Sequence, residues 1–210
     1  MPDRGQAAGR VSLKIEPLTA ALWPDLEDLF DTTGPCGRCW CMYWQLGPAY
    51  RKQPGAANRA AFRAVVERGP PPGLLAFDGD RAIGWCQVTP RDAVPWLDRE
   101  WRLKRIDDLP VWSLSCLYVR KGCRRQGVTT ALIEAALAMA KRAGAPALEA
   151  YPFDAAVSPS ATGTGYASTF LRAGFTEVAR HVRPRPILRH ALKGHDVPLS
   201  GGAHGLADSA

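Results

Sequence analysis

The sequence contains no apolar run long enough to cross a lipid bilayer, and its first ten residues, MPDRGQAAGR, lack the apolar centre of a signal peptide. It also contains no internal repeat and no heptad pattern, which excludes a solenoid and a coiled coil. The 210 residues are 46% hydrophobic and 22% charged, as is usual for a globular protein with its own core. We therefore expect a soluble, cytoplasmic protein without a membrane partner.

Acidic residues are scarce relative to basic ones. The chain has 27 Lys and Arg residues against 20 Asp and Glu residues, which gives a formal net charge of +7. A balance of this sign is typical of proteins that bind an anionic partner, such as a phosphorylated cofactor or a nucleic acid, although an Arg-rich genome would also produce it. Because the aromatic residues are not interleaved with arginine, the sequence disfavours nucleic acid.

The cysteines do not have the spacing of a complete metal site. They are Cys36, Cys39, Cys41, Cys86, Cys116 and Cys123. Without an export signal we expect free thiols rather than disulfides. Cys36 and Cys39 have the spacing of half a zinc site or of a redox pair, and Cys41 could supply a third ligand. No second Cys or His pair follows at a useful distance, so the sequence predicts no metal site.

Hydrophobic periodicity predicts a mixed arrangement of strands and helices. Strands are expected over residues 12–18, 73–90 (a hairpin around Asp78-Gly79-Asp80), 111–119, 147–153, 175–182 and 186–192. Helices are expected over residues 19–30, 57–69, 126–144 and 166–174, and loops over residues 31–48 and 154–165. This order predicts an α/β (α+β) fold in one domain, residues 11–193, between loose tails at residues 1–10 and 194–210.

A basic turn, RKGCRRQG, directly precedes the longest predicted helix. A helix N-terminus presents unpaired backbone N–H groups and a partial positive charge, so it binds anions. Gly127 has no β-carbon and lets an anion approach the backbone closely. Arg124 and Arg125 add charge that suits phosphate, and Thr129 and Thr130 add hydroxyl donors. The turn is therefore interpreted as a pyrophosphate site, with a plain turn and solvated arginines as the alternative.

The stretch LYVRKGCRRQGVTTALIEAAL resembles the acetyl-CoA motif of the GCN5-related N-acetyltransferases (GNAT). In that motif four residues separate a strand Val from an Arg or Gln. Two residues separate that position from a Gly, and one residue separates the Gly from a final Gly or Ala. Val119, Arg124 and Gly127 match, whereas Thr129 occupies the last position. The stretch FLRAGF resembles the family's closing signature, and the order of predicted elements also fits, so the resemblance covers most of the chain.

The resemblance implies a mixed central sheet flanked by helices, in which the central parallel strands splay apart and admit the pantetheine of acetyl-CoA. It implies that Leu117 and Val119 offer backbone groups to the pantetheine and acetyl arm. The residues it assigns to the pyrophosphate are Arg124, Arg125, Gln126, Gly127, Val128, Thr129 and Thr130. The cosubstrate would be acetyl-CoA, and no metal would take part.

The resemblance also implies direct transfer of the acetyl group to a neutral amine, with a Tyr as the usual general acid. Phe170 occupies the position of that Tyr. Tyr166 lies one helical turn earlier on the same face and is the candidate replacement. Glu149 and Cys116, on the two splayed strands, are the candidate bases. Alternatives left open are a structural role for each of these residues, a base that acts through water, and departure of the thiolate toward water.

The loop CGRCWCMYW would form one wall of the acceptor site in this family. Trp40, Met42, Tyr43 and Trp44 are then an aromatic wall for an apolar or cationic acceptor. The alternative is a lid that packs on the core without touching substrate. The Arg-rich stretch RHVRPRPILRH is interpreted as a solvated strand pair or, alternatively, as a contact to the 3′-phosphate of coenzyme A.

Together these features predict an acetyl-CoA-dependent N-acetyltransferase that acts on a primary amine of a small molecule or of a protein. The alternatives are transfer of a longer acyl group, a non-catalytic acyl-CoA-binding module, which the Phe at position 170 favours, and a basic nucleic-acid-binding domain. The resemblance is compatible with a homodimer.

Overall fold

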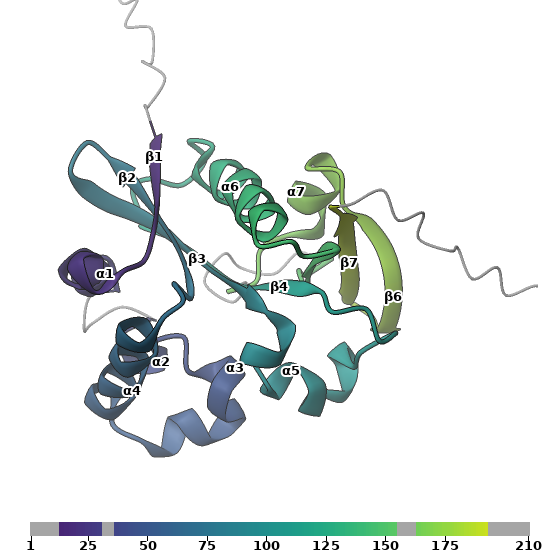
Figure 1. Cartoon of the computed structure of the whole chain (residues 1–210), viewed down its shortest axis with the longest axis horizontal. Helices are drawn as coiled ribbons and strands as arrows, with labels where there is room; N and C mark the ends of the chain where they lie inside the picture. The colour runs from purple at the N-terminus through teal and green to yellow at the C-terminus, as the bar shows by residue number, and fades with distance from the viewer. Residues whose placement is uncertain (1–12, 31–35, 155–162, 193–210) are drawn as a thin grey trace, which may run out of the picture.

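The computed structural model describes residues 13–30, 36–154 and 163–192. Both predicted tails and most of the predicted 154–165 loop therefore lie outside the described residues. The described strands form one seven-stranded sheet in the order β1-β2-β3-β4-β5-β7-β6 (Figure 1). The strands are β1 (Leu13–Pro17), β2 (Gly73–Asp78), β3 (Arg81–Pro90), β4 (Trp112–Val119), β5 (Ala147–Ala150), β6 (Thr176–Val182) and β7 (Arg185–Ala191).

The helices follow the predicted order. They are α1 (Trp23–Phe30), α2 (Cys36–Cys39), α3 (Tyr43–Leu46), α4 (Gly55–Arg68), α5 (Trp96–Arg99), α6 (Val128–Arg142) and α7 (Ala167–Arg172). Short 3-10 turns occupy Ala20–Leu22, Gly47–Lys52, Arg91–Ala93 and Trp101–Leu103. The predicted α/β fold is confirmed. The segment 36–48, expected as loop, instead contains α2 and α3, because local backbone hydrogen bonds close these short turns.

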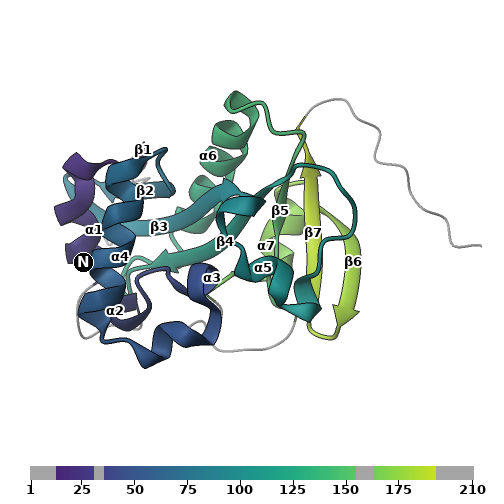
Figure 2. The same ribbon diagram turned by 60° about the horizontal axis from the view of Figure 1, so that its bottom comes forward.

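The sheet is covered by helices on both faces (Figures 1 and 2). On one face α6 packs its apolar stripe, which consists of Val128, Leu132, Ile133, Ala136 and Ala140, against β2 and β3. The approach is close: a β-carbon on Gly84 would lie 2.7 Å from Val128 Cγ1. On the other face α1 and α4 bury Leu26 and Phe62 around Trp85 of β3. The strand-and-helix pattern of the sequence therefore places its two large apolar clusters on opposite sides of one sheet.

The only parallel neighbours in the described sheet, β4 and β5, separate partway along β4. They pair over three positions, Trp112 with Leu148, Ser113 with Glu149 and Leu114 with Ala150. Beyond this point β4 continues to Val119 without β5. Two other segments contact β4 there: the Trp44 indole N–H donates to the Ser115 carbonyl at 2.7 Å, and the Leu117 N–H donates to the Gly163 carbonyl at 2.7 Å. The expected splay between the central strands is therefore present.

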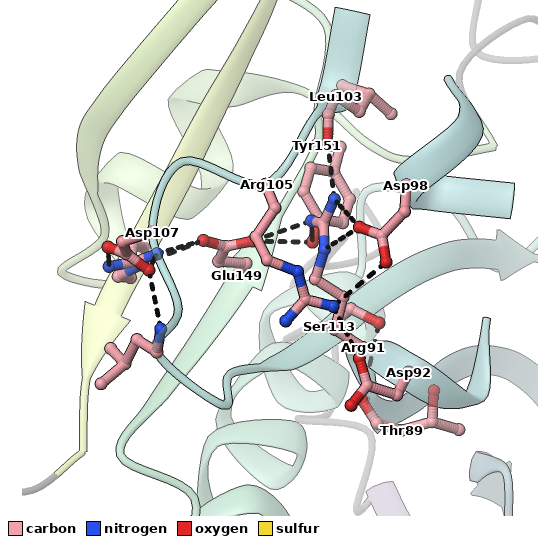
Figure 3. A network of polar contacts seen from close by, with 12 residues as sticks. Thr89, Arg91, Asp92, Asp98, Leu103, Arg105, Asp107, Ser113, Glu149 and Tyr151 are labelled. Atoms are coloured by element: carbon pink, nitrogen blue, oxygen red, sulfur yellow. Dashed lines mark hydrogen bonds and ion pairs between the residues drawn. The ribbon is translucent and has the colours of Figure 1, made fainter. Parts of the chain in front are cut away.

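A buried ion-pair network fixes β5 at Glu149, one residue before β4 and β5 separate (Figure 3). The Glu149 carboxylate accepts hydrogen bonds from Arg91 Nη1 at 3.1 Å, from Arg189 Nη2 at 2.6 Å and from the Tyr151 hydroxyl at 2.9 Å. The side chains of Glu149 and both arginines are at most 4% exposed. Because Arg91 follows β3 and Arg189 lies on β7, one carboxylate joins three parts of the sheet.

The outer side of this network reaches the segment between β3 and β4. Arg91 also donates to Asp98 at 3.0 Å and to the Leu103 carbonyl at 2.7 Å. Arg189 also donates to both oxygens of Asp107, and these hydrogen bonds lower the pKa of that carboxyl. The segment 91–110, which contains α5 and two 3-10 turns, is thereby bound to β5 and β7.

Replacing Glu149 by Gln tests how much the fold depends on this carboxylate. We expect the free energy of unfolding to fall by about 3–5 kcal/mol, because the change leaves two buried guanidinium groups without their shared counter-charge. Urea denaturation followed by circular dichroism measures this loss.

The matched control is Glu177→Gln, because Glu177 is exposed and pairs only with exposed Arg180 in the described structure. This variant should lose less than about 1 kcal/mol. Equal losses in the two variants would show that the network does not stabilise the fold.

Candidate active site

A cavity of about 490 Å³ opens between the end of β4 and the first turns of α6 and α7. We call it the cofactor pocket. Its lining includes these predicted cofactor residues: Leu117, Val119, Arg124, Arg125, Gly127, Val128, Thr129 and Thr130. Gln126 does not line the cavity; its side-chain amide donates to the Gly122 carbonyl at 3.3 Å. The structure thus brings together nearly the whole predicted set, from both the strand and the helix.

The start of α6 has the backbone geometry that an anion site needs. Gly127 is the N-cap residue and is left-handed, with φ 80° and ψ −4°, and Arg125 is left-handed as well, with φ 64°. The N–H groups of residues 127–130 donate to no group in the described part of the chain, and the first helical bond runs from the Ala131 N–H to the Gly127 carbonyl. A β-carbon on Gly127 would meet nothing within 4 Å, so this backbone is open to a ligand.

Leu117 lines the cofactor pocket, but its N–H group is not open. It donates to the Gly163 carbonyl, in the segment that leads into α7. Gly165 in the same segment is left-handed, and a β-carbon there would lie 3.0 Å from Leu117 Cδ1 and 3.1 Å from Phe170 Cε2. The segment therefore lies close against β4, at the residue whose backbone the family resemblance assigned to the pantetheine and acetyl arm.

A second cavity, of about 700 Å³, lies beside α3, the segment 100–103 and the turn between β6 and β7. We call it the acceptor pocket. Residues that are close in sequence line different pockets. Leu117 and Gly165 line the cofactor pocket, whereas Cys116 and Gly163 line the acceptor pocket. The two pockets therefore lie next to the splay, on either side of β4 and the 163–165 segment.

Two of the four predicted acceptor residues lie elsewhere. Tyr43 and Trp44 line the acceptor pocket, and their rings pack edge to face at 4.7 Å. Trp40 instead stacks on Trp23 at 5.7 Å in the core, and Met42 is buried in the same apolar cluster. The cause is the turn after α2, where Trp40 is left-handed with φ 45° and directs its indole to the Gly37 carbonyl. Trp40 and Met42 therefore pack on the core, and neither lines the acceptor pocket.

Three thiols, those of Cys39, Cys41 and Cys116, line the acceptor pocket. All six cysteines are free. Burial, with a smaller contribution from Cys116, raises the pKa of Cys39 to about 11, so this thiol stays protonated and weakly nucleophilic at neutral pH. Among the described residues, no group of three or more His, Cys, Asp or Glu side chains is arranged to hold a metal ion.

The three predicted catalytic residues occupy three different places. Tyr166 lines the cofactor pocket at the N-cap of α7, and Cys116 lines the acceptor pocket. Glu149 lines neither cavity, and both of its oxygens accept hydrogen bonds from buried partners. This arrangement gives Glu149 a structural role and leaves it no lone pair directed toward an amine. Phe170 is fully buried and packs against Phe175, so it takes no part in either pocket.

The acceptor pocket also contains residues that the sequence did not indicate. Its charged lining consists of Arg51, Glu100, Arg102, Arg183 and Arg185. The stretch RHVRPRPILRH was noticed for its arginines and assigned to solvent or to the 3′-phosphate of coenzyme A. The structure instead places Arg183 and Arg185 at the acceptor pocket, because the β6–β7 turn approaches the 100–103 segment there. Only the tertiary arrangement brings these residues together.

A mixed sheet with splayed parallel strands, and a glycine-capped helix beside the splay, define an acetyltransferase fold. A family model supports this class directly. The chain belongs to the Acetyltransferase (GNAT) family, whose model matches residues 23–156. It is therefore an N-acetyltransferase with acetyl-CoA as its cosubstrate, which confirms the resemblance seen in the motif around Gly127.

Solved structures share this fold at low sequence identity. One is an N-acetyltransferase from Staphylococcus aureus Mu50, with 14% identity, a TM-score of 0.54, and coverage of 87% of this chain and 99% of that one. Another is the PaiA N-acetyltransferase from Thermoplasma acidophilum in complex with coenzyme A, with 15% identity, a TM-score of 0.51, and coverage of 86% and 99%. A third is an acetyltransferase from Thermus thermophilus, with 17% identity, a TM-score of 0.51, and coverage of 87% and 99%.

The search of curated proteins gave no match. In the part of the chain that the structure describes, no helix has both the length and the apolar character that a membrane span requires.

Replacing Gly127 by Ala tests the α6 turn. A side chain in the left-handed region costs about 1–2 kcal/mol, so the turn should relax and misalign the N–H groups of the first helical turn. We expect acetyl-CoA to bind about tenfold more weakly, as measured by calorimetry. Gly122→Ala is the matched control, because Gly122 lies in the preceding turn, has no positive φ and has open space around it. Equal affinity of the two variants would contradict the assignment of the turn.

Proposed function

We propose that the protein transfers the acetyl group of acetyl-CoA directly to a primary amine bound in the acceptor pocket. One observation carries the proposal: two neighbouring cavities lie beside the splay, with the turn that begins α6 in one and aromatic and charged side chains in the other. Direct transfer requires both substrates at once, and adjoining cavities satisfy this requirement. We further propose that residues 11–193 form the catalytic domain.

The residues of the cofactor pocket fit coenzyme A. The open N–H groups of residues 127–130 suit a diphosphate, and Arg124 and Arg125 supply positive charge beside them. The Thr129 side chain, at the position where the family motif has Gly or Ala, lines the same pocket and offers a hydroxyl donor. Acetyl-CoA supplies a thioester whose carbonyl carbon accepts the lone pair of the amine.

The acceptor pocket favours the neutral form of an amine without a dedicated base. Its lining has four arginines and one carboxylate, Glu100, which pairs with Arg102 through hydrogen bonds of 2.7 and 2.8 Å. Those hydrogen bonds lower the pKa of Glu100, so it is a weak base. The surplus positive charge lowers the pKa of a bound ammonium group. The amine can then lose its proton to water before it attacks.

Tyr166 is the proposed general acid that protonates the departing thiolate. It lies in extended conformation at the start of α7 and lines the cofactor pocket together with Thr169. The position where the family usually has its acid is occupied by the buried Phe170, which has no proton to give. A phenol in the cofactor pocket is close to where the coenzyme arm must lie.

Tyr166→Phe removes this hydroxyl and keeps the ring. We expect kcat to fall about 100-fold, the low end of the range for general acid catalysis, while the Kd for acetyl-CoA stays the same. Thiol release under saturating acetyl-CoA measures kcat, and calorimetry measures Kd. An unchanged kcat would assign the proton to water and leave Tyr166 a structural role.

Direct transfer also predicts that no acetyl group passes through Cys116. Intact mass spectrometry after incubation with acetyl-CoA alone should show the unmodified chain, and initial-rate plots should intersect, as for a ternary complex. Cys116→Ala should retain most of its turnover. An acetyl group on Cys116 that disappears when amine is added would overturn direct transfer but would leave the enzyme class unchanged.

A further inference from the structure

The acceptor pocket is electropositive, contrary to the apolar or cationic acceptor that the aromatic residues suggested. Arg102 and Glu100 neutralise each other, which leaves Arg51, Arg183 and Arg185 without a carboxylate in the described lining. Arg51 and Arg183 are exposed, so water solvates their charge. Arg185 is different, because it is half-buried.

Within the described residues, four arginines are not exposed: Arg91, Arg120, Arg185 and Arg189. Three of them pair with carboxylates: Arg91 and Arg189 with Glu149, and Arg120 with Asp28. The Arg185 side chain has no hydrogen bond and no ion pair in the described part of the chain. Residues 155–162, which the structure does not describe, have the sequence AAVSPSAT and contain no acidic residue. Within the described residues, Arg185 is therefore a half-buried cation without a directly bonded counter-ion, and the Glu100 carboxylate offsets only part of its charge.

The partial burial of Arg185 destabilises its charged form, and its pKa shows this effect. Desolvation, together with the like charge of Arg102, lowers the pKa of Arg185 to about 10, which still leaves it protonated at neutral pH. A protein that folds with an unpaired, half-buried cation beside a cavity gains free energy when an anion enters that cavity.

The orientation of Arg185 suits a planar anion. Its guanidinium carbon lies 4.3 Å from the centre of the Phe153 ring, and both residues line the acceptor pocket. A guanidinium stacked on a ring keeps its N–H donors in its own plane and free of the ring. Two of these donors in parallel match the two oxygens of a carboxylate.

We propose that Arg185 binds a carboxylate of the acceptor, so that the acceptor is an amine that also carries a carboxylate, as α-amino acids do. This inference rests on the proposed function and adds the class of acceptor. The carboxylate is held at the Phe153 and Arg185 wall, and the amine extends toward Cys116 and the splay. Tyr43 and Trp44 then face the remaining, apolar part of the acceptor.

The arginines of the acceptor pocket disfavour polyamines and amines without a carboxylate. A polyamine would bring two or more positive charges into a cavity that already has a surplus of them, which like-charge repulsion disfavours. An amine without a carboxylate would leave Arg185 unpaired and gain nothing from it.

The test compares pairs of acceptors that differ only in the carboxylate. Thiol release from acetyl-CoA is measured with a panel of α-amino acids, their carboxamides, spermidine and 2-aminoethyl phosphate. We expect kcat/KM for the preferred amino acid to exceed that for its carboxamide by about 10- to 100-fold, and to exceed that for spermidine as well. Amides that react as well as the acids, or a preference for spermidine, would overturn the inference.

The variant Arg185→Met separates binding from folding. It should raise KM for the amino acid about 10- to 100-fold, lower kcat/KM for the carboxamide much less, because only the effect of one positive charge on the amine pKa is lost there, and leave the Kd for acetyl-CoA unchanged. Because Arg185 has no counter-ion in the described structure, its loss should leave the melting temperature unchanged or raise it. A large fall in melting temperature, or an equal effect on acid and amide, would show a structural role instead. Arg68→Met, at an exposed arginine outside both pockets, is the control.

The outcomes distinguish this inference from the function on which it rests. A protein that binds acetyl-CoA but acetylates no amine of the panel overturns the proposed amine acceptor, and the inference with it. Transfer to amides or to spermidine without preference for acids overturns the inference alone. A preference for 2-aminoethyl phosphate over every amino acid would show that the anion is a phosphate and would overturn the carboxylate assignment.

Discussion

Glu149, held between two buried arginines, is the interaction on which the site geometry depends. Its carboxylate joins the end of β3, through Arg91, to β7, through Arg189, while its backbone pairs with Ser113 of β4. The pairing of the central strands is thereby fixed to the three positions around this residue. Beyond them β4 and β5 are free to diverge, and both cavities open from that divergence. Glu149, a candidate base from the sequence, therefore stabilises the strand arrangement instead.

Two other segments of the chain contact β4 in the part of the strand that β5 does not pair with. An indole from α3 and a carbonyl from the 163–165 segment bind the exposed edge of β4, one on each side of Cys116. The acceptor pocket and the cofactor pocket are thus built against consecutive residues of one strand. In the proposed direct transfer, both pockets can therefore contribute to one step although their linings come from distant parts of the chain.

Most helices and strands could be predicted from the sequence, because the patterns that indicate them involve residues close together in the chain. Apolar periodicity and the glycine at position 127 predict α6 and its N-terminal turn, and alternation predicts the strands. The pairing of Glu149 with Arg91 and Arg189 joins residues 58 and 40 positions apart, and no local pattern encodes it. Trp40 and Trp44 look alike in the sequence, yet a left-handed turn between them sends one to the core and the other to the pocket. Arg185 looked like a solvated arginine for the same reason.

The bond from the Trp44 indole to the Ser115 carbonyl has a wider consequence. It attaches one wall of the acceptor pocket to the strand beside which the coenzyme must lie, whereas the charged wall comes from the separate turn between β6 and β7. Under the proposed function, chemistry and selectivity are therefore carried by different parts of the chain. Variation in the β6–β7 turn would then alter which acceptors are recognised without changing the strand beside which the thioester is proposed to lie.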